Sequence, residues 1–115
     1  MNGIAKSRLA VAVLILASGL AQGAEADLGS GKKIFDKWCG ICHAEGRYMP
    51  GTNGLKAKYK EEKTALLEDR TDLPAALVKV FVRSGVGIMA PFRKTEISDA
   101  ELEDLAVYLA RNTPK

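Results

Sequence analysis

The chain has 115 residues, of which 47% are hydrophobic and 27% are charged, a composition typical of one small globular domain. Its 17 basic and 14 acidic residues give a formal net charge of only +3, so nothing in the sequence supports binding to nucleic acid. Two cysteines and one histidine are also too few to complete a zinc site with four Cys or His ligands.

Residues 1–26 are predicted to be a cleaved signal peptide. Lys6 and Arg8 precede an apolar stretch at residues 9–17, which is shorter than the roughly 20 residues that span a bilayer. Small residues offer cleavage sites between residues 23 and 26, and no cysteine lies nearby to carry a lipid. We therefore expect export to the periplasm, a mature domain of residues 27–115 and no membrane span after cleavage. An uncleaved membrane anchor is the alternative.

The first half of the mature sequence predicts one helix followed by a loop. A helix is expected from about residue 31 to residue 41, because its apolar residues fall on one helical face. Residues 45–53 contain two glycines, a proline and an asparagine and are predicted to form a loop. Residues 55–68 are lysine-rich and predicted to be partly helical. The residues of the first apolar face are Ile34, Phe35, Trp38 and Cys42.

The second half predicts two further helices. Residues 71–74 resemble a helix start, since polar capping residues precede Pro74, and Gly85 is a suitable end. Ser98 and Glu101 form a capping box for a last helix that ends near Asn112. No segment alternates as a strand would, so the predicted fold class is all-α, with about four helices. The predicted apolar faces consist of Leu73, Leu77, Val80 and Phe81, and of Leu102, Leu105, Ala106 and Leu109.

A Cys-x-x-Cys-His run contains both cysteines, Cys39 and Cys42, and the one histidine, His43. This spacing is typical of covalent haem attachment, in which the two thiols form thioethers with the haem vinyl groups and the histidine ligates the iron. A thioredoxin-like redox pair is the alternative, but it would need a βαβ context that the sequence lacks. The run therefore predicts one covalently attached haem c.

Two methionines outside the signal segment are candidates for the second axial ligand. Met89 lies beside Pro91 in the predicted loop before the last helix, whereas Met49 follows His43 by only six residues. So short a loop would have to cross to the opposite haem face, which favours Met89. Both methionines could instead be apolar filler, the usual role of this residue.

With these features in this order, the chain resembles a class I monohaem cytochrome c. In that family the first and last helices cross closely where a glycine meets an aromatic residue, and Gly31 and Tyr108 match those positions. The resemblance also implies that the carbonyl of Pro50 accepts a hydrogen bond from His43 and orients the ring. The residue before this proline is usually glycine in the family, and here it is Met49.

Cationic or hydroxyl side chains near the haem are expected to meet its propionates, since such donors offset buried negative charge. Arg47 is the candidate that we carry forward from this group. The other residues considered for this role are Tyr48, Trp38, Tyr59 and Arg93.

Filling both axial positions with protein ligands favours single-electron transfer and not enzyme catalysis. Residues 70–73 and 89–102 further resemble cytochrome subunits of cresol-methylhydroxylase-like flavocytochromes. That resemblance implies a flavoprotein oxidoreductase as electron donor and a downstream cytochrome or oxidase as acceptor. A freely diffusing periplasmic carrier to a terminal oxidase is the alternative, and a haem enzyme or gas sensor is a more remote one. Docking is expected around the haem edge, at Gly40, Ile41, Ala44, Ile88, Ala90 and Pro91.

Overall fold

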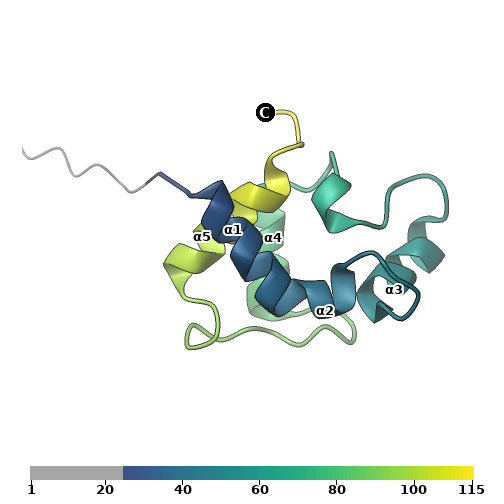
Figure 1. The fold of residues 1–115 in the computed structure, drawn as a ribbon, viewed down its shortest axis with the longest axis horizontal. Helices are drawn as coiled ribbons and strands as arrows, with labels where there is room; N and C mark the ends of the chain where they lie inside the picture. Colours follow the sequence, from purple (N-terminus) through teal and green to yellow (C-terminus); the bar gives the residue numbers. More distant parts are fainter. Residues whose placement is uncertain (1–24) are drawn as a thin grey trace, which may run out of the picture.

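The structure, a computed structural model, describes residues 25–115, so the predicted signal peptide lies outside the described residues except for its last two positions. The described part is helical (Figure 1), and its one pairing of extended segments is an isolated bridge between Val86 and Met89. The all-α prediction is therefore confirmed. The elements in chain order are α1 (Leu28–Ile34), η1 (Phe35–Cys39), α2 (Gly40–His43), α3 (Pro50–Tyr59), η2 (Leu67–Asp69), α4 (Ala75–Ser84) and α5 (Asp99–Ala110).

The first helical stretch is longer than predicted, since α1, η1 and α2 follow one another without a break from residue 28 to residue 43. It begins at Asp27, whose side chain accepts a hydrogen bond from the Gly29 amide at 2.8 Å. Two glycines in this first turn weaken the sequence signal for a helix. A π-helical turn, η1, lies in the middle, where the Gly40 amide donates to the Phe35 carbonyl five residues earlier.

Helices α1 and α5 cross at close range (Figure 1) and form the centre of the fold. A Cβ atom placed on Gly31 would lie 2.5 Å from Cβ of Tyr108 and closer still to the Asp104 carbonyl oxygen. Since real Cβ atoms essentially never come within 3.0 Å of another atom, only glycine allows this approach. The predicted contact between Gly31 and Tyr108 is confirmed. Phe35 and Leu105 are fully buried beside it.

Helix α3 begins inside the segment that was predicted to be a loop. The prediction is wrong from residue 50 onward, because Pro50 is the first residue of α3. Proline suits that position, where its missing amide hydrogen would have no helical partner anyway. Helix α3 ends at Tyr59, and the residue that follows it, Lys60, has a φ of 53°. Residues 60–66 are irregular before the short turn η2.

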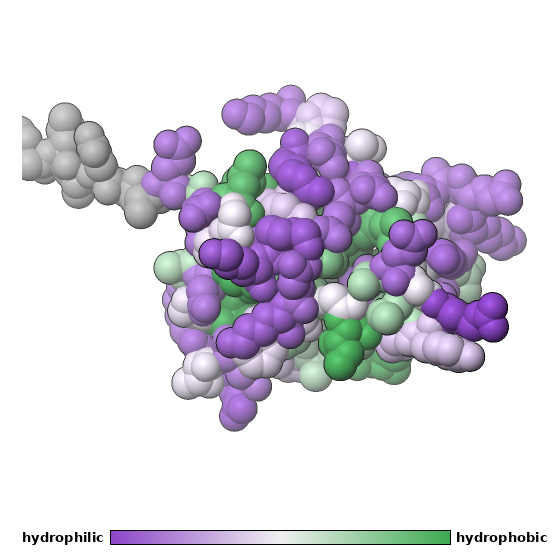
Figure 2. All heavy atoms as spheres, viewed as in Figure 1, coloured by the Kyte–Doolittle hydropathy of each residue, from purple (hydrophilic) through white to green (hydrophobic). Residues whose placement is uncertain are grey.

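Helices α4 and α5 agree closely with the predicted boundaries. Gly85 ends α4 with a φ of 70°, and the capping box of Ser98 and Glu101 is present at the start of α5. Val80 is a correction, because it lies 55% exposed instead of in the core. No helix in residues 25–115 is long and apolar enough to cross a membrane. The face drawn in Figure 2 is largely hydrophilic, with hydrophobic side chains at the surface near α2.

Candidate functional site

A mostly apolar crevice opens between α2, α3, α4 and the loop before α5. It consists of two adjoining cavities of about 200 and 640 Å³, which share lining residues from α2, α3 and that loop. The fold therefore encloses a space for a large apolar ligand, bounded by only a few polar groups. The shared lining residues are Cys39, His43, Leu55, Lys58, Val86 and Met89. The smaller cavity is also lined by Leu67, Leu73, Leu77, Phe81, Leu105 and Leu109.

Both predicted thiols are at the wall of this crevice. Cys39 lines both cavities and Cys42 lines the larger one, and both are free thiols. Cys39 is buried, and this burial raises the pKa of its thiol to about 12, with a smaller contribution from Cys42. Cys39 is the last residue of the π-helical turn η1, and Cys42 follows it in α2. Such π-helical turns are often found at functional sites.

His43 faces the same crevice and its second ring nitrogen is unpaired. Burial lowers the pKa of His43, so the neutral imidazole, the form that binds metal ions, is favoured. Its Nδ1 atom is buried without a hydrogen-bond partner. The expected hydrogen bond to the Pro50 carbonyl is therefore not formed. As the first residue of α3, Pro50 directs its carbonyl along the helix toward the amide four residues later.

Met89 is held over the crevice by a tight turn. The amides of Val86 and Met89 each donate to the carbonyl of the other at 3.0 Å, and Gly87 between them has a φ of 57°. A Cβ atom on Gly85 would lie 2.5 Å from the Met89 carbonyl oxygen, so this position also requires glycine. Met49 lines neither cavity. The structure thus brings Met89, and not Met49, to the crevice.

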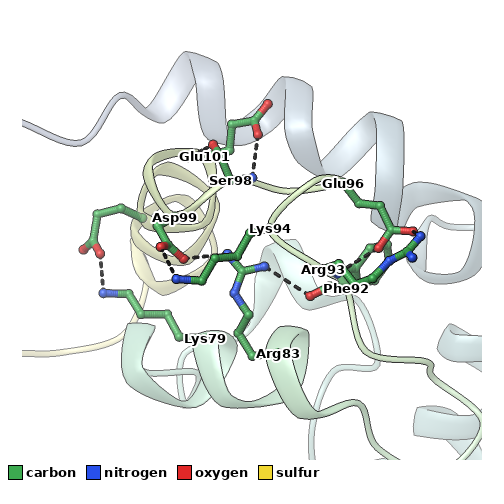
Figure 3. A network of polar contacts seen from close by, with 10 residues as sticks. Lys79, Arg83, Phe92, Arg93, Lys94, Glu96, Ser98, Asp99 and Glu101 are labelled. Carbon is green, nitrogen blue, oxygen red and sulfur yellow. Dashed lines mark hydrogen bonds and ion pairs between the residues drawn. The ribbon is translucent and has the colours of Figure 1, made fainter.

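A network of polar contacts fixes the loop that carries Met89 (Figure 3). The Phe92 amide donates to the Val82 carbonyl at 2.8 Å, and the Arg83 guanidinium donates to the Phe92 carbonyl at 3.2 Å. Arg83 also pairs with Asp99 at 2.9 Å, as does Lys94 at 2.7 Å. These contacts tie the end of α4 and the start of α5 to the loop between them.

The polar groups on the crevice wall differ from those predicted. Arg47 is exposed and lines neither cavity, so its predicted role at the propionates has no support in the structure. Arg47 lies in the loop before α3, where its carbonyl accepts a hydrogen bond from the Asn53 side-chain amide at 2.8 Å. Tyr48 and Arg93 line neither cavity, whereas Tyr59 and Trp38 each line one.

Arg70 is a wall residue that the sequence analysis missed. It lines the smaller cavity with Lys58 and Tyr59 and is only 6% exposed. Its guanidinium lies 4.8 Å from the Tyr59 ring centre and bonds to Asp72 at 3.0 Å. The available signal was the Arg70-Thr71-Asp72 run, but the irregular segment before it gave no way to place the run in space.

Comparison with known proteins connects this site to a family. The family model described as cytochrome C oxidase, cbb3-type, subunit III matches residues 26–109. The 4-cresol dehydrogenase (hydroxylating) cytochrome c subunit of Pseudomonas putida is 35% identical over 97 residues, covering 84% of this chain and 72% of that protein. Cytochrome c6 of Leptolyngbya boryana is 32% identical over 90 residues, covering 78% and 98%.

This chain belongs to that family and is a class I monohaem cytochrome c. It carries covalently attached haem c with iron, and it acts as an electron carrier. Membership decides against the zinc site and the thioredoxin-like pair. It also decides against an enzyme, because the relatives are electron-transfer cytochromes.

The crevice of this cytochrome fits such a group. Two free thiols separated by two residues, a histidine ring and a methionine border a space with apolar walls. His43 lines both cavities, and its burial favours the neutral imidazole, which is the form that binds a metal ion. The names of the relatives differ in the partner that they imply, since one is a dehydrogenase subunit and the other is cytochrome c6.

Proposed function

We propose that this cytochrome carries single electrons in the periplasm, as a mature domain of residues 27–115, and accepts them from a flavoprotein oxidoreductase as its subunit or partner. The observation that carries the proposal is the 35% identity to a protein named as the cytochrome c subunit of a dehydrogenase. A downstream cytochrome or oxidase would then take the electron.

Four residues of the crevice hold the haem in this proposal. Cys39 and Cys42 would hold the haem through thioethers, and His43 and Met89 would ligate its iron. The haem, when bound, supplies an iron that alternates between the ferrous and ferric states. A thioether ligand favours the ferrous state and raises the reduction potential, and the walls of the crevice are mostly apolar. Cys39→Ser/Cys42→Ser is expected to lose its haem to acidified organic solvent, and a double variant that retains haem would overturn the covalent attachment.

Arg70, Lys58 and Tyr59 are the proposed partners of the haem propionates. All three line the smaller cavity, and Asp72 is the carboxylate bonded to Arg70. A guanidinium suits a carboxylate partner because it presents several donors in a fixed plane. Arg70 is buried and already oriented by Asp72, so little entropy is lost when it binds a further carboxylate.

The proposed docking surface is the apolar rim of the larger cavity. Ile41, Ile88, Ala90 and Pro91 line this cavity, and Ile41 and Ile88 are 76% and 93% exposed. Side chains so large and exposed gain most from burial against a partner. Lysines near α3 are the residues that would steer association by charge, namely Lys56, Lys58, Lys60 and Lys63.

Ile88→Glu/Ala90→Glu tests the docking surface. Stopped-flow reduction by the partner flavoprotein is expected to slow at least tenfold, while the spectrum and potential stay nearly constant. Lysine variants are expected to change mainly the salt dependence of the association rate. If the double glutamate variant is reduced at the original rate, docking occurs elsewhere on the molecule.

A free carrier to a terminal oxidase is the second candidate. It is favoured by the similarity to cytochrome c6, which this chain matches over 98% of the length of the Leptolyngbya boryana protein. Size-exclusion chromatography of the cytochrome with the flavoprotein separates the two candidates. A stable complex supports the subunit, whereas two separate peaks together with rapid oxidation by oxidase membranes support the free carrier.

A further inference from the structure

The first turn of α3 lies directly against the proposed axial histidine. A Cβ atom on Gly51 would lie 2.6 Å from His43 Cε1, 2.8 Å from His43 Nδ1 and 2.8 Å from the Cys42 carbonyl oxygen. All three distances are below the 3.0 Å that real Cβ atoms essentially never cross. The backbone of Gly51 is therefore in contact with the edge of the imidazole that carries Nδ1.

The two residues after Gly51 fix this turn in place. Thr52 is fully buried, and its hydroxyl donates to the Ala44 carbonyl at 2.9 Å. The Asn53 side-chain amide donates to the Arg47 carbonyl at 2.8 Å. Both hydrogen bonds hold the loop that follows His43 against α3. The first turn of α3 can therefore resist a rotation of the His43 ring.

A histidine that binds a metal is usually oriented by a hydrogen bond at its other ring nitrogen. His43 lacks that bond here, and backbone packing occupies the same edge of the ring. We propose that Gly51 is a positioning residue, which fixes the orientation of the His43 ring by contact in place of the hydrogen bond. This inference rests on the proposed role of His43 as axial ligand.

Gly54 provides a matched control in the same helix. Gly54 also lines the larger cavity, and no protein atom lies within 4 Å of a Cβ atom placed on it, so Gly54→Ala adds the same methyl group to the crevice wall without a contact to His43. Glycine costs up to about 1 kcal/mol relative to alanine inside a helix. Gly54→Ala is therefore expected to stabilise the protein slightly, whereas Gly51→Ala must displace the ring or the turn.

The test compares the ferric electron paramagnetic resonance g-values and the reduction potential of the holo-cytochrome and its variants. Gly51→Ala is expected to shift both, because the ring plane sets the iron orbital splitting, while the methionine charge-transfer band persists. Gly54→Ala, which adds a methyl group to the crevice wall away from His43, is expected to shift both less than Gly51→Ala does. Gly51→Ala with the g-values and potential of the original protein would overturn the proposal.

Thr52→Val keeps the test decisive if Gly51→Ala yields no holoprotein. It removes the bond to Ala44 at nearly constant volume, and a smaller shift of the g-values in the same direction is expected. Unchanged g-values in Thr52→Val would then count against the positioning role. His43→Ala distinguishes failure of the ligand assignment from failure of the positioning role. If the ferric spectrum of His43→Ala equals that of the original protein, His43 is not the ligand. If that spectrum changes but the g-values and potential of Gly51→Ala do not, only the positioning role of Gly51 is refuted.

Discussion

Gly31→Ala tests the helix crossing on which the crevice depends. The added methyl group would lie 2.5 Å from Cβ of Tyr108 and closer still to the backbone of Asp104. Ordinary contacts begin near 3.4 Å, so α1 and α5 would have to separate by roughly 1 Å, enough to forfeit a quarter to a half of each packing contact. Because the opposing atoms include main-chain carbonyl atoms, rotation of a side chain cannot relieve the overlap.

The expected cost follows from two opposing effects. Overpacking a core usually costs about 1–3 kcal/mol, and a rigid backbone neighbour places this site at the upper end. Replacing a helical glycine with alanine returns up to about 1 kcal/mol. The net loss is therefore about 2 kcal/mol, a large part of the roughly 5–15 kcal/mol that stabilises a typical domain. For a domain of this size it corresponds to a Tm lower by about 10 °C.

The assay is thermal unfolding of the holo-cytochrome followed by circular dichroism, with the original protein as the reference. A Gly31→Ala protein that unfolds at the same temperature as the original protein would contradict the expected loss, since it would show that the two helices separate without cost.

Three further changes test the site and its supports. Met89→Ala is expected to abolish the methionine charge-transfer band and to lower the reduction potential. Met49→Ala is expected to change both little, because only Met89 lines the crevice. The reverse pattern would mean that Met49, and not Met89, ligates the iron. Hydrogen bonds from Arg70 and Lys63 lower the pKa of Asp72 from 3.8 to about 2, so its stabilisation is complete above pH 4 and is lost as pH falls toward 2. Asp72→Asn should cost about 1 kcal/mol at pH 7, since the carboxylate is partly exposed, and nothing at pH 2; a loss independent of pH in urea unfolding contradicts this. Arg83 donates a hydrogen bond to the Phe92 carbonyl, so Arg83→Ala should make the charge-transfer band disappear on heating well before the helices melt. Lys79→Ala should not have this effect, because the ion pair of Lys79 with Glu103 joins α4 to α5 and not to the loop.

The sequence predicted those elements whose signals are local. Helix α5 carries its own capping box and a regular apolar face, so its start and its buried residues followed from the pattern alone. Helix α4 ends at Gly85 for the same reason. The crossing of α1 and α5 was predictable as well, but only through the family resemblance, because nothing local pairs Gly31 with Tyr108.

The errors occur where a residue's local preference and its tertiary role differ. Pro50 and Gly51 indicated a loop, yet they lie in the first turn of α3, where proline suits the first position and glycine allows a close approach to His43. Arg70 could not be assigned to the crevice because the irregular residues 60–66 determine where it lies. The missing hydrogen bond at His43 depends on how α3 begins, which the sequence did not specify.

Two of the close glycine contacts restrain opposite ends of one helical stretch. Gly31 allows α1 to pack closely against α5, and Gly51 allows α3 to pack closely against the end of α2. Residues 28–43 are therefore held at both ends. Between them η1 inserts one extra residue into a turn, which rotates everything that follows by about 100° relative to an unbroken α-helix. Phe35 can therefore face α5 while Cys39 and His43 face the crevice. A ligand fixed in this way has little freedom to rearrange, and rigid coordination favours rapid electron transfer because the iron changes charge without a change in its surroundings.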